Sequence, residues 1–161
     1  MKTQNTLAAL GIRCFEPDQQ MIEWLRGYLG NRIPLDVGCG QGDLLMELNK
    51  GGLGIDPFFD GDRLEFAMKH IHILPMTVQE CGKFITGLGK KAVMIIARPC
   101  HSNFIEDAID MAPKGMEILY ITKPENIIDY CDLGKYDDQK VLVQHEGQGA
   151  ENEVVYSIIK K

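Results

Sequence analysis

The chain has 161 residues, of which 45 % are hydrophobic and 25 % charged, as in an ordinary globular protein rather than a disordered or fibrous one. A chain of this length buries about 70 % of its unfolded surface, so we expect one compact domain over residues 17–161, preceded by an N-terminal extension over residues 1–16. The formal charge of −6 disfavours general nucleic-acid binding, which depends on many Lys and Arg contacts with phosphates.

The cysteines and the apolar runs both indicate a cytoplasmic protein. The five cysteines are an odd number and include no Cys-x-x-Cys pair, which argues against a disulfide framework and against a structural zinc site. The longest apolar runs, such as residues 92–97, are far shorter than the roughly 20 residues of a transmembrane helix. We therefore expect reduced thiols and no membrane span.

The first half of the chain alternates predicted helices with predicted strands. An amphipathic helix is expected over residues 18–29, with Pro17 near its start and Gly30 after its end. The short apolar stretches that follow are typical of buried strands, and the segments between them have helical spacing. Strands are expected over residues 33–37, 51–55 and 71–74, and helices over residues 44–48, 63–69 and 78–88.

The second half continues the alternation and then departs from it. Residues 92–97 predict the clearest buried strand, followed by a helix over residues 103–111 and a strand over residues 116–122. Residues 141–145 and 154–159 leave no room for a crossover helix, so they predict an antiparallel hairpin. We therefore expect a doubly wound α/β fold with a seven-stranded sheet in the order 3-2-1-4-5-7-6, in which only the last strand is antiparallel.

A glycine-rich turn, Gly38-Cys39-Gly40-Gln41-Gly42, follows the first predicted strand. In open parallel sheets, ligands bind beyond the carboxyl ends of strands, and glycines there let the backbone turn sharply and let a ligand approach it closely. Asp56 ends the second predicted strand, where a carboxylate can accept hydrogen bonds from ribose hydroxyls. The spacing Gly-x-Gly-x-Gly differs from the dinucleotide fingerprint Gly-x-Gly-x-x-Gly, and Asp43 would face a pyrophosphate unfavourably.

Two segments resemble motifs of the class I S-adenosylmethionine-dependent methyltransferases. Residues 35–43 are similar to the family's acidic residue followed by Gly-x-Gly-x-Gly, and Gly54-Ile55-Asp56 is similar to its second motif. The resemblance covers nearly the whole chain after about residue 17. It implies a methyltransferase that uses S-adenosylmethionine as cofactor, with a cofactor site formed by Asp36, Gly38, Cys39, Gly40, Gly42, Asp56, Pro57, Phe58, Met76 and Thr77.

The resemblance also implies a role for each part of that site. The three glycines would line the methionyl part of the cofactor, Asp36 would support the loop electrostatically, and Asp56 would hold the ribose. Pro57 and Phe58 would pack on the adenine, and Met76 and Thr77 would contact the other side of the ring. The alternative for Phe58 and Met76 is that they are ordinary packing residues, since Met often fills gaps in cores.

The segment after the fourth predicted strand is the expected wall of the acceptor site. It offers Arg98 as an anchor for an anionic acceptor, Cys100 as a thiol and His101 as a general base, since imidazole titrates near neutral pH. Methyltransferases that act on the amino groups of nucleobases resemble one another in having a polar residue and an aromatic residue at particular positions of this segment. This chain has neither of them at those positions. The alternative is structural: Pro99 ends the strand, Ser102 or Asn103 caps the next helix, and His101 is a solvated loop residue.

Other readings of the chain stay open. His70 and His72 lack a third ligand at a convincing spacing, so we interpret them as structural and expect no metal site. Lys83, Lys90, Lys91 and Arg98 form either a local basic patch or simply a solvated face.

Only residues 124–139 and the N-terminal residues remain to form the walls of a substrate site. The chain could therefore bind S-adenosylmethionine in a regulatory role without transferring a methyl group, need a partner to complete its acceptor site, or bind a nucleotide or dinucleotide.

Overall fold

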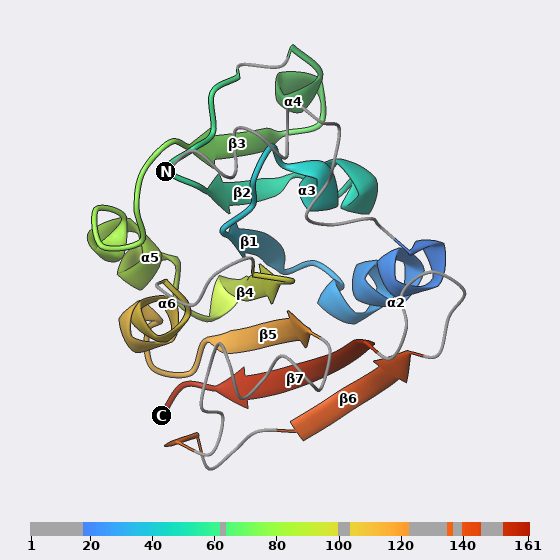
Figure 1. Ribbon diagram of the computed structural model, residues 1–161, viewed down its shortest axis with the longest axis vertical. Coiled ribbons are helices and arrows are strands. Elements are labelled where there is room, and N and C mark those ends of the chain that lie inside the picture. The colour runs from blue at the N-terminus through green and yellow to red at the C-terminus, as the bar shows by residue number, and fades with distance from the viewer. Residues whose placement is uncertain (1–17, 62–63, 100–103, 123–134, 137–139, 146–152) are drawn as a thin grey trace.

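The computed structural model describes residues 18–61, 64–99, 104–122, 135–136, 140–145 and 153–161. These residues form three layers, with a central sheet covered by helices on both faces (Figure 1). Among them, no helix is both long and apolar enough to span a membrane.

The sheet has seven strands in the order β3-β2-β1-β4-β5-β7-β6. The pairs among β1 to β5 are parallel, and β7 is antiparallel to both β5 and β6, so the predicted order and the predicted single reversed strand are confirmed. The strands are β1 (Ile33–Val37), β2 (Gly52–Ile55), β3 (Ile71–Leu74), β4 (Ala92–Ala97), β5 (Glu117–Thr122), β6 (Lys140–His145) and β7 (Glu153–Ile159).

Each parallel connection between β1 and β5 contains a helix, as parallel pairing requires. Helix α2 precedes the sheet, and the Asp18 carboxylate caps it by accepting a hydrogen bond from the Gln20 N–H at 2.8 Å. The helices are α2 (Gln19–Leu29), α3 (Asp43–Leu48), α4 (Leu64–Met68), α5 (Gly82–Leu88) and α6 (Ile105–Met111), with a 3₁₀ turn η1 (Gly89–Lys91).

Two predicted helix starts are wrong. The helix expected from residue 78 begins only at Gly82: the Cys81 N–H is shared between the Thr77 and Val78 carbonyls and the Gly82 N–H donates to the Gln79 carbonyl, so the residues before it form turns. The helix expected from residue 103 begins at Ile105, with Phe104 at the N-cap and no side-chain cap. Ser102 and Asn103, the expected caps, lie outside the described residues.

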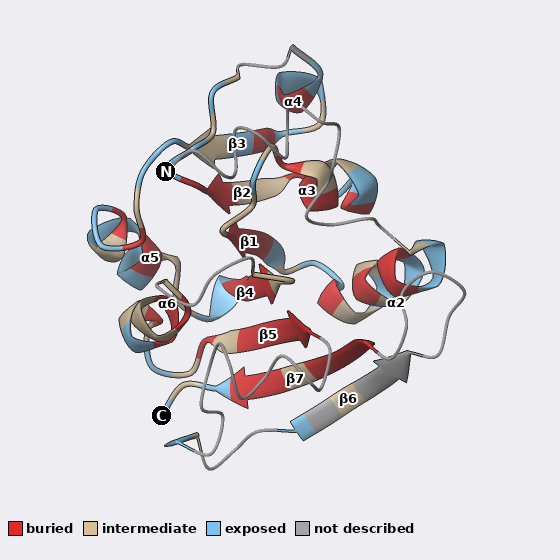
Figure 2. Ribbon diagram, viewed as in Figure 1, coloured by how far each residue is buried: buried red, intermediate tan, exposed pale blue. Residues whose placement is uncertain are grey.

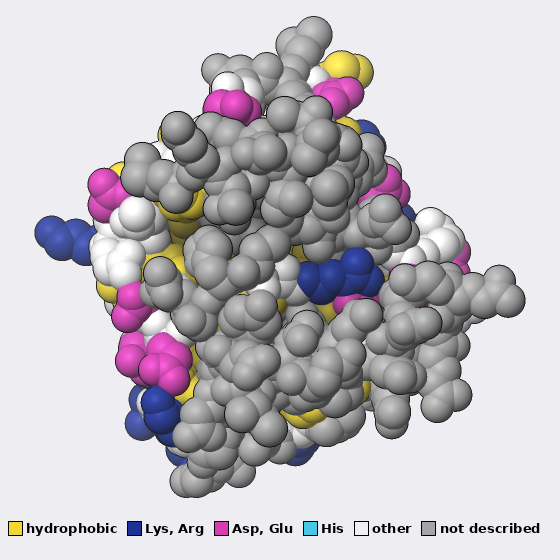
Figure 3. Space-filling view, viewed as in Figure 1, with side chains coloured by type: hydrophobic (Ala, Val, Ile, Leu, Met, Phe, Trp, Pro, Cys, Tyr) yellow, Lys and Arg dark blue, Asp and Glu magenta, His cyan; other side chains and the backbone are white. Residues whose placement is uncertain are grey.

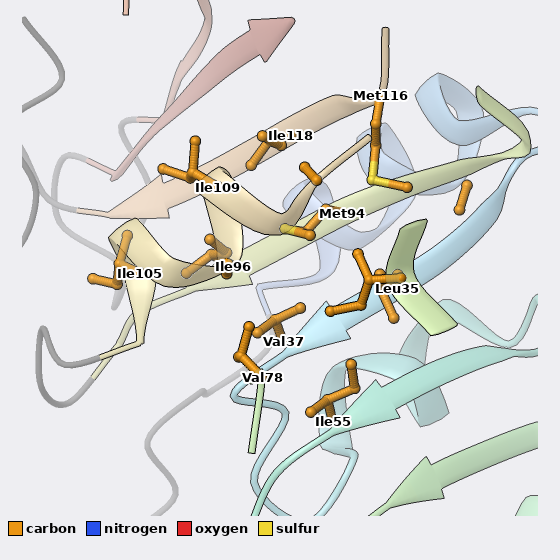
Figure 4. Packing of buried hydrophobic residues seen from close by; sticks show 14 of the residues in the cluster. Leu35, Val37, Ile55, Val78, Met94, Ile96, Ile105, Ile109, Met116 and Ile118 are labelled. Carbon is orange, nitrogen blue, oxygen red and sulfur yellow. The ribbon is translucent and has the colours of Figure 1, made fainter. Parts of the chain in front are cut away.

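The hydrophobic core has a layer on each face of the sheet (Figure 2). Along β4, Met94 and Ile96 pack towards α5 and α6, whereas Val93 and Ile95 pack towards α2 and α3. Figure 4 shows the first layer, in which Ile105 and Ile109 of α6 lie over Ile96. Because both faces of β4 are covered, its sequence reads as a continuous apolar run rather than an alternating one.

Candidate functional site

The glycine-rich turn lies at the carboxyl end of β1, next to the carboxyl ends of β2 and β4. Gly38, Gly40 and Gly42 all have left-handed backbones, with φ of 74°, 56° and 80°. Residues with a side chain rarely adopt this conformation, so the turn needs glycine at these three positions for its backbone alone.

The three glycines differ in what surrounds them. A Cβ atom on Gly38 would lie 2.5 Å from Cζ of Phe104, and a Cβ on Gly42 would lie 2.6 Å from Cδ1 of Ile73. A Cβ on Gly40 would meet no atom of the described residues within 4 Å. Packing of the protein itself therefore explains the missing side chains at Gly38 and Gly42, whereas no described residue occupies the corresponding position at Gly40.

Most N–H groups of the turn are bound within the protein. The N–H groups of Gly38 and Cys39 both donate to the Ile55 carbonyl, at 2.8 and 3.3 Å, and the Gly42 N–H donates to the Cys39 carbonyl at 2.9 Å. The Gly40 N–H donates to Oδ2 of Asp56 at 2.8 Å. The turn therefore does not present the row of free N–H groups with which a phosphate-binding loop holds its ligand.

Asp56 is the residue that fixes the shape of the turn. Its other oxygen, Oδ1, accepts a hydrogen bond from the Phe58 N–H at 2.8 Å, and the residue is only 6 % exposed. One carboxylate thus joins the glycine turn to the loop that follows β2. A carboxylate oxygen can accept more than one hydrogen bond, so these two contacts leave it able to bind ribose hydroxyls as well.

Asp36, in β1, lies beneath the turn and is 3 % exposed. Burial, together with the nearby charge of Asp56, raises the pKa of Asp36 to about 8. Burial and the same two carboxylates also raise the pKa of the Cys39 thiol well above its ordinary value. At neutral pH Asp36 is therefore largely protonated and Cys39 is a neutral thiol, and a positively charged ligand at this edge would favour the ionised form of Asp36.

The residues expected around the adenine lie at the ends of two neighbouring strands. Ile55 and Leu74 are paired across β2 and β3, and Pro57, Phe58 and Met76 follow them as exposed residues. Phe58 is 43 % exposed and Met76 36 %. These values are high for ordinary core packing and leave both side chains accessible to a ligand.

Thr77 has a different environment. Its N–H and hydroxyl both donate to Oε2 of Glu80, at 2.7 and 2.8 Å, and these bonds lower the pKa of Glu80. The side chain thus closes the turn before α5, and its predicted contact with the adenine would have to coexist with the bond to Glu80.

Arg98, the expected anchor for an anionic acceptor, already has an anionic partner. Its Nε donates to Oε1 of Glu153, whose side chain is 1 % exposed. Arg98 also has a left-handed backbone, with φ of 43°. Its charge is therefore balanced within the protein. Cys100 and His101 lie outside the described residues.

Glu153 and Phe104 are the two residues at this edge that sequence reasoning missed. Glu153 begins β7, and its Oε2 atom is buried without a hydrogen-bond partner among the described residues. Phe104 precedes α6 and places its ring against Gly38. No local pattern marks either residue, because Glu153 is 55 positions from its partner Arg98, and Phe104 is 66 positions from Gly38.

The described residues contain no group of three or more His, Cys, Asp or Glu side chains that could hold a metal ion. His70 and His72 lie at the start of β3, at the end of the sheet opposite the glycine turn.

Solved structures that are similar to this chain include methyltransferases. The chain superposes with a TM-score of 0.59 on a SAM-dependent O-methyltransferase from Thermotoga maritima, at 10 % identity over 96 % of this chain and 70 % of that one. An RNA methyltransferase from Salinibacter ruber, in complex with S-adenosyl-L-homocysteine, gives 0.58 at 14 % identity over 91 % and 95 % of the two chains. The chain has the class I methyltransferase fold.

A SAM-dependent methyltransferase from Archaeoglobus fulgidus has the same fold, with a TM-score of 0.54 and 14 % identity over 89 % of this chain and 95 % of that one. No protein-family model matches the sequence, and no curated protein matches it. Identities this low relate the chain to these proteins by fold. The acceptors of the structural neighbours range from RNA to small molecules, so the methyltransferase fold leaves the acceptor open.

Proposed function

We propose that this protein binds S-adenosylmethionine at the turn after β1 and transfers its methyl group to an acceptor at the same edge of the sheet. The observation that carries the proposal is the geometry around Gly40. This glycine has a left-handed backbone and no neighbour among the described residues where its side chain would be, and its N–H is bound to the Asp56 carboxylate.

The charges at this edge fit that cofactor. S-adenosylmethionine has a sulfonium and an ammonium group, and the buried carboxyls Asp36 and Asp56 suit a cationic ligand. A dinucleotide would instead place a pyrophosphate beside the same carboxyls, at a turn whose N–H groups are largely bound within the protein. The residues present therefore support S-adenosylmethionine over a dinucleotide.

When bound, S-adenosylmethionine supplies an activated methyl group. The residues of the chain have three tasks: Asp56 orients the ribose, Phe58 and Met76 flank the adenine, and Gly40 lets the ligand approach the backbone. Methyl transfer by direct displacement mainly requires positioning, and a base is needed only when the acceptor carries a proton. His101 is our candidate for that base. We propose that Arg98 borders the acceptor as part of a neutral pair with Glu153, not as a free cation.

Calorimetry with S-adenosylmethionine, S-adenosylhomocysteine and NAD tests the proposed cofactor. We expect stoichiometric binding of the first two ligands and none of NAD. Binding of NAD alone would contradict this proposal and would indicate a dinucleotide-binding protein. Transfer of a labelled methyl group to any acceptor would exclude a purely regulatory role.

The variant Asp56→Ala tests the predicted ribose contact. It should weaken S-adenosylmethionine binding by about 1.5–3 kcal/mol, the range for hydrogen bonds to a charged group. Asp56→Asn keeps an acceptor oxygen and should lose less. The control is Asp60→Ala, which removes an exposed carboxylate four residues later and should leave affinity unchanged. Unchanged affinity in a folded Asp56→Ala protein would contradict the assignment.

The variant His101→Ala tests the predicted base once an acceptor is known. It should lower kcat by about 10²-fold or more, because general base catalysis contributes at least that much, while cofactor affinity stays nearly constant. Full turnover from about pH 6 to about pH 9 would show that His101 is not the base and would favour the loop-residue alternative.

A further inference from the structure

The amino edge of the sheet, opposite the proposed cofactor site, carries a row of cations. Parallel strands begin at one edge and lie about 4.8 Å apart, so residues just before neighbouring strands stand side by side. The five parallel strands each have a Lys or Arg within three residues of their first residue, and antiparallel β7 has two directly after its end. In sheet order, this basic row consists of Lys69, Lys50, Arg32, Lys90, Lys91, Lys114, Lys160 and Lys161.

Contacts within the structure show that part of this row converges. The Gly115 N–H donates to the Lys160 carbonyl at 2.6 Å, which joins the turn before β5 to the end of β7. A Cβ on Gly115 would lie 2.5 Å from Cε of Lys90, so the Lys90 stem packs on this turn, next to Lys114. Lys and Arg side chains gather beside the C-terminus in the space-filling view (Figure 3).

Few carboxylates neutralise the row. Glu117 pairs with Arg32, and Asp110 lies 3.7 Å from Lys160. Lys50, Lys91 and Lys114 are exposed and form no ion pair with a carboxylate of the described residues.

Stabilisation of helix ends accounts for only part of the row. Cations favour the last turn of a helix, but α3, α4, α5 and α6 have no basic residue there. Lys69 does reach the Met46 carbonyl of α3 at 3.5 Å, Arg32 donates to the Tyr28 and Leu29 carbonyls at the end of α2, and Lys90 and Lys91 lie in the last turn of η1. Lys50 and Lys114 need another explanation.

A groove of about 630 Å³ adjoins the row at the amino ends of β1, β2 and β3. Its polar lining comes from Asn31, Arg32, Asn49, Lys50, His70 and His72, and includes no carboxylate. Ile33 adds an apolar surface that is 40 % exposed. The groove thus combines cations, amides and two exposed imidazole rings, which are groups that contact phosphates and bases.

We propose that the amino edge binds single-stranded nucleic acid, with phosphates along the basic row and a base in the groove against His70 or His72. The row crosses five strand spacings, about 24 Å, and so matches an extended phosphate chain. The stacking rings beside it favour nucleic acid over an acidic polypeptide, and an unpaired base is needed to enter the groove. This proposal is independent of the proposed function, because the two sites lie at opposite edges.

Fluorescence anisotropy with a labelled oligouridine of about 20 nucleotides tests the proposal. The triple variant Lys50→Glu, Lys91→Glu, Lys114→Glu should bind at least about 10-fold more weakly than wild type at about 50 mM salt. The slope of log K against log salt concentration should fall by about 2, since each phosphate contact on a single strand contributes about 0.7. Lys90 stays unchanged because its stem packs on Gly115.

The matched control compares two single charge reversals. Lys91→Glu should weaken binding severalfold, whereas Lys83→Glu, in the first turn of α5 and away from the row, should change it less than about 2-fold. His72→Ala should weaken oligouridine binding but leave inorganic polyphosphate binding unchanged, because only the former has bases to stack.

Three results would overturn the proposal. The first is no oligouridine binding by the wild-type protein at about 50 mM salt, and the second is unchanged binding by the folded triple variant. The third is tighter binding of polyglutamate than of oligouridine, which would assign the row to an acidic protein partner instead.

Discussion

The two edges of the sheet are built from opposite kinds of residue. At the carboxyl edge, Asp36 and Asp56 are buried at a turn of left-handed glycines, and Glu153 is buried at the start of β7. At the amino edge, cations such as Lys50 and Lys91 are exposed. The net charge of −6 is therefore an average over two unlike surfaces, and an argument from net charge against nucleic-acid binding does not hold for each surface separately.

The two edges also differ in how much their charged groups cost in folding free energy. A buried carboxyl either finds a partner or shifts its pKa, because removing a charge from water costs several kcal/mol. An exposed Lys keeps its hydration and costs little. Changes at the carboxyl edge should therefore affect folding strongly, and the following predictions start from the largest effect.

Removing one member of the buried ion pair should have the largest effect. Glu153→Ala leaves the Arg98 guanidinium without its partner and should lower the free energy of unfolding by about 3–5 kcal/mol. Glu106→Ala, which breaks an exposed pair with Lys135, should cost about 0–1 kcal/mol. Urea unfolding measures both values. Equal losses of unfolding free energy in the two variants would contradict the view that burial of an ion pair determines how much its removal destabilises the protein.

The next prediction distinguishes Gly42, whose missing side chain is explained by packing, from Gly40, which we propose contacts the ligand. Gly42→Ala should lower the free energy of unfolding by about 2–5 kcal/mol, because it combines a left-handed backbone with a clash against Ile73. Gly40→Ala has the backbone cost alone, about 1–2 kcal/mol, but should weaken S-adenosylmethionine binding more than its stability loss explains. Urea unfolding and calorimetry provide the two readouts. A Gly40→Ala protein with wild-type affinity would argue against a ligand beside this glycine.

Taken per pH unit, the smallest expected effect is the pH dependence due to Asp36. Folded Asp36 keeps its proton up to about pH 8, whereas the unfolded chain loses it near the ordinary aspartic acid pKa of 3.8. The folded state thus binds more protons between these values, and the free energy of unfolding should fall as pH rises, by about 1.4 kcal/mol per pH unit.

Asp36→Asn should remove this contribution without changing the size of the side chain. Urea unfolding at several pH values between about 5 and 7 measures the slope. If the variant and the wild type show the same slope, Asp36 is ionised in the folded protein. The carboxyl edge would then hold a buried negative charge rather than a neutral acid.

Much of the fold could be predicted because the relevant signals are local. Strands β1, β3 and β4 have the bounds that the sequence predicts, and β4 is apolar throughout because both of its faces are covered. The start of α5 was predicted too early, because short-range bonds of the Cys81 and Gly82 N–H groups to the Val78 and Gln79 carbonyls form turns within an otherwise helical pattern.

The candidate site was predictable only where its residues are close in sequence. The turn from Gly38 to Gly42 is one continuous segment, and Asp56 stands at the end of the next strand, so spacing alone located both. The pairing of Arg98 with Glu153 depends on a strand that returns antiparallel from the end of the chain. The sequence places Arg98 near Lys90 and Lys91, but β4 separates them by its full length, which argues against the alternative of one local basic patch that includes Arg98.

The sequence by itself determined the alternation of strands and helices, the reversed last strand and the place of the glycine turn, because periodicity and turn residues act over a few positions. Only the tertiary structure decided which glycine borders open space, which carboxyls lose contact with water and which cations stand in one row. Those properties depend on groups that crossover connections bring together from distant positions, and burial and electrostatic coupling depend on distance in space rather than along the chain.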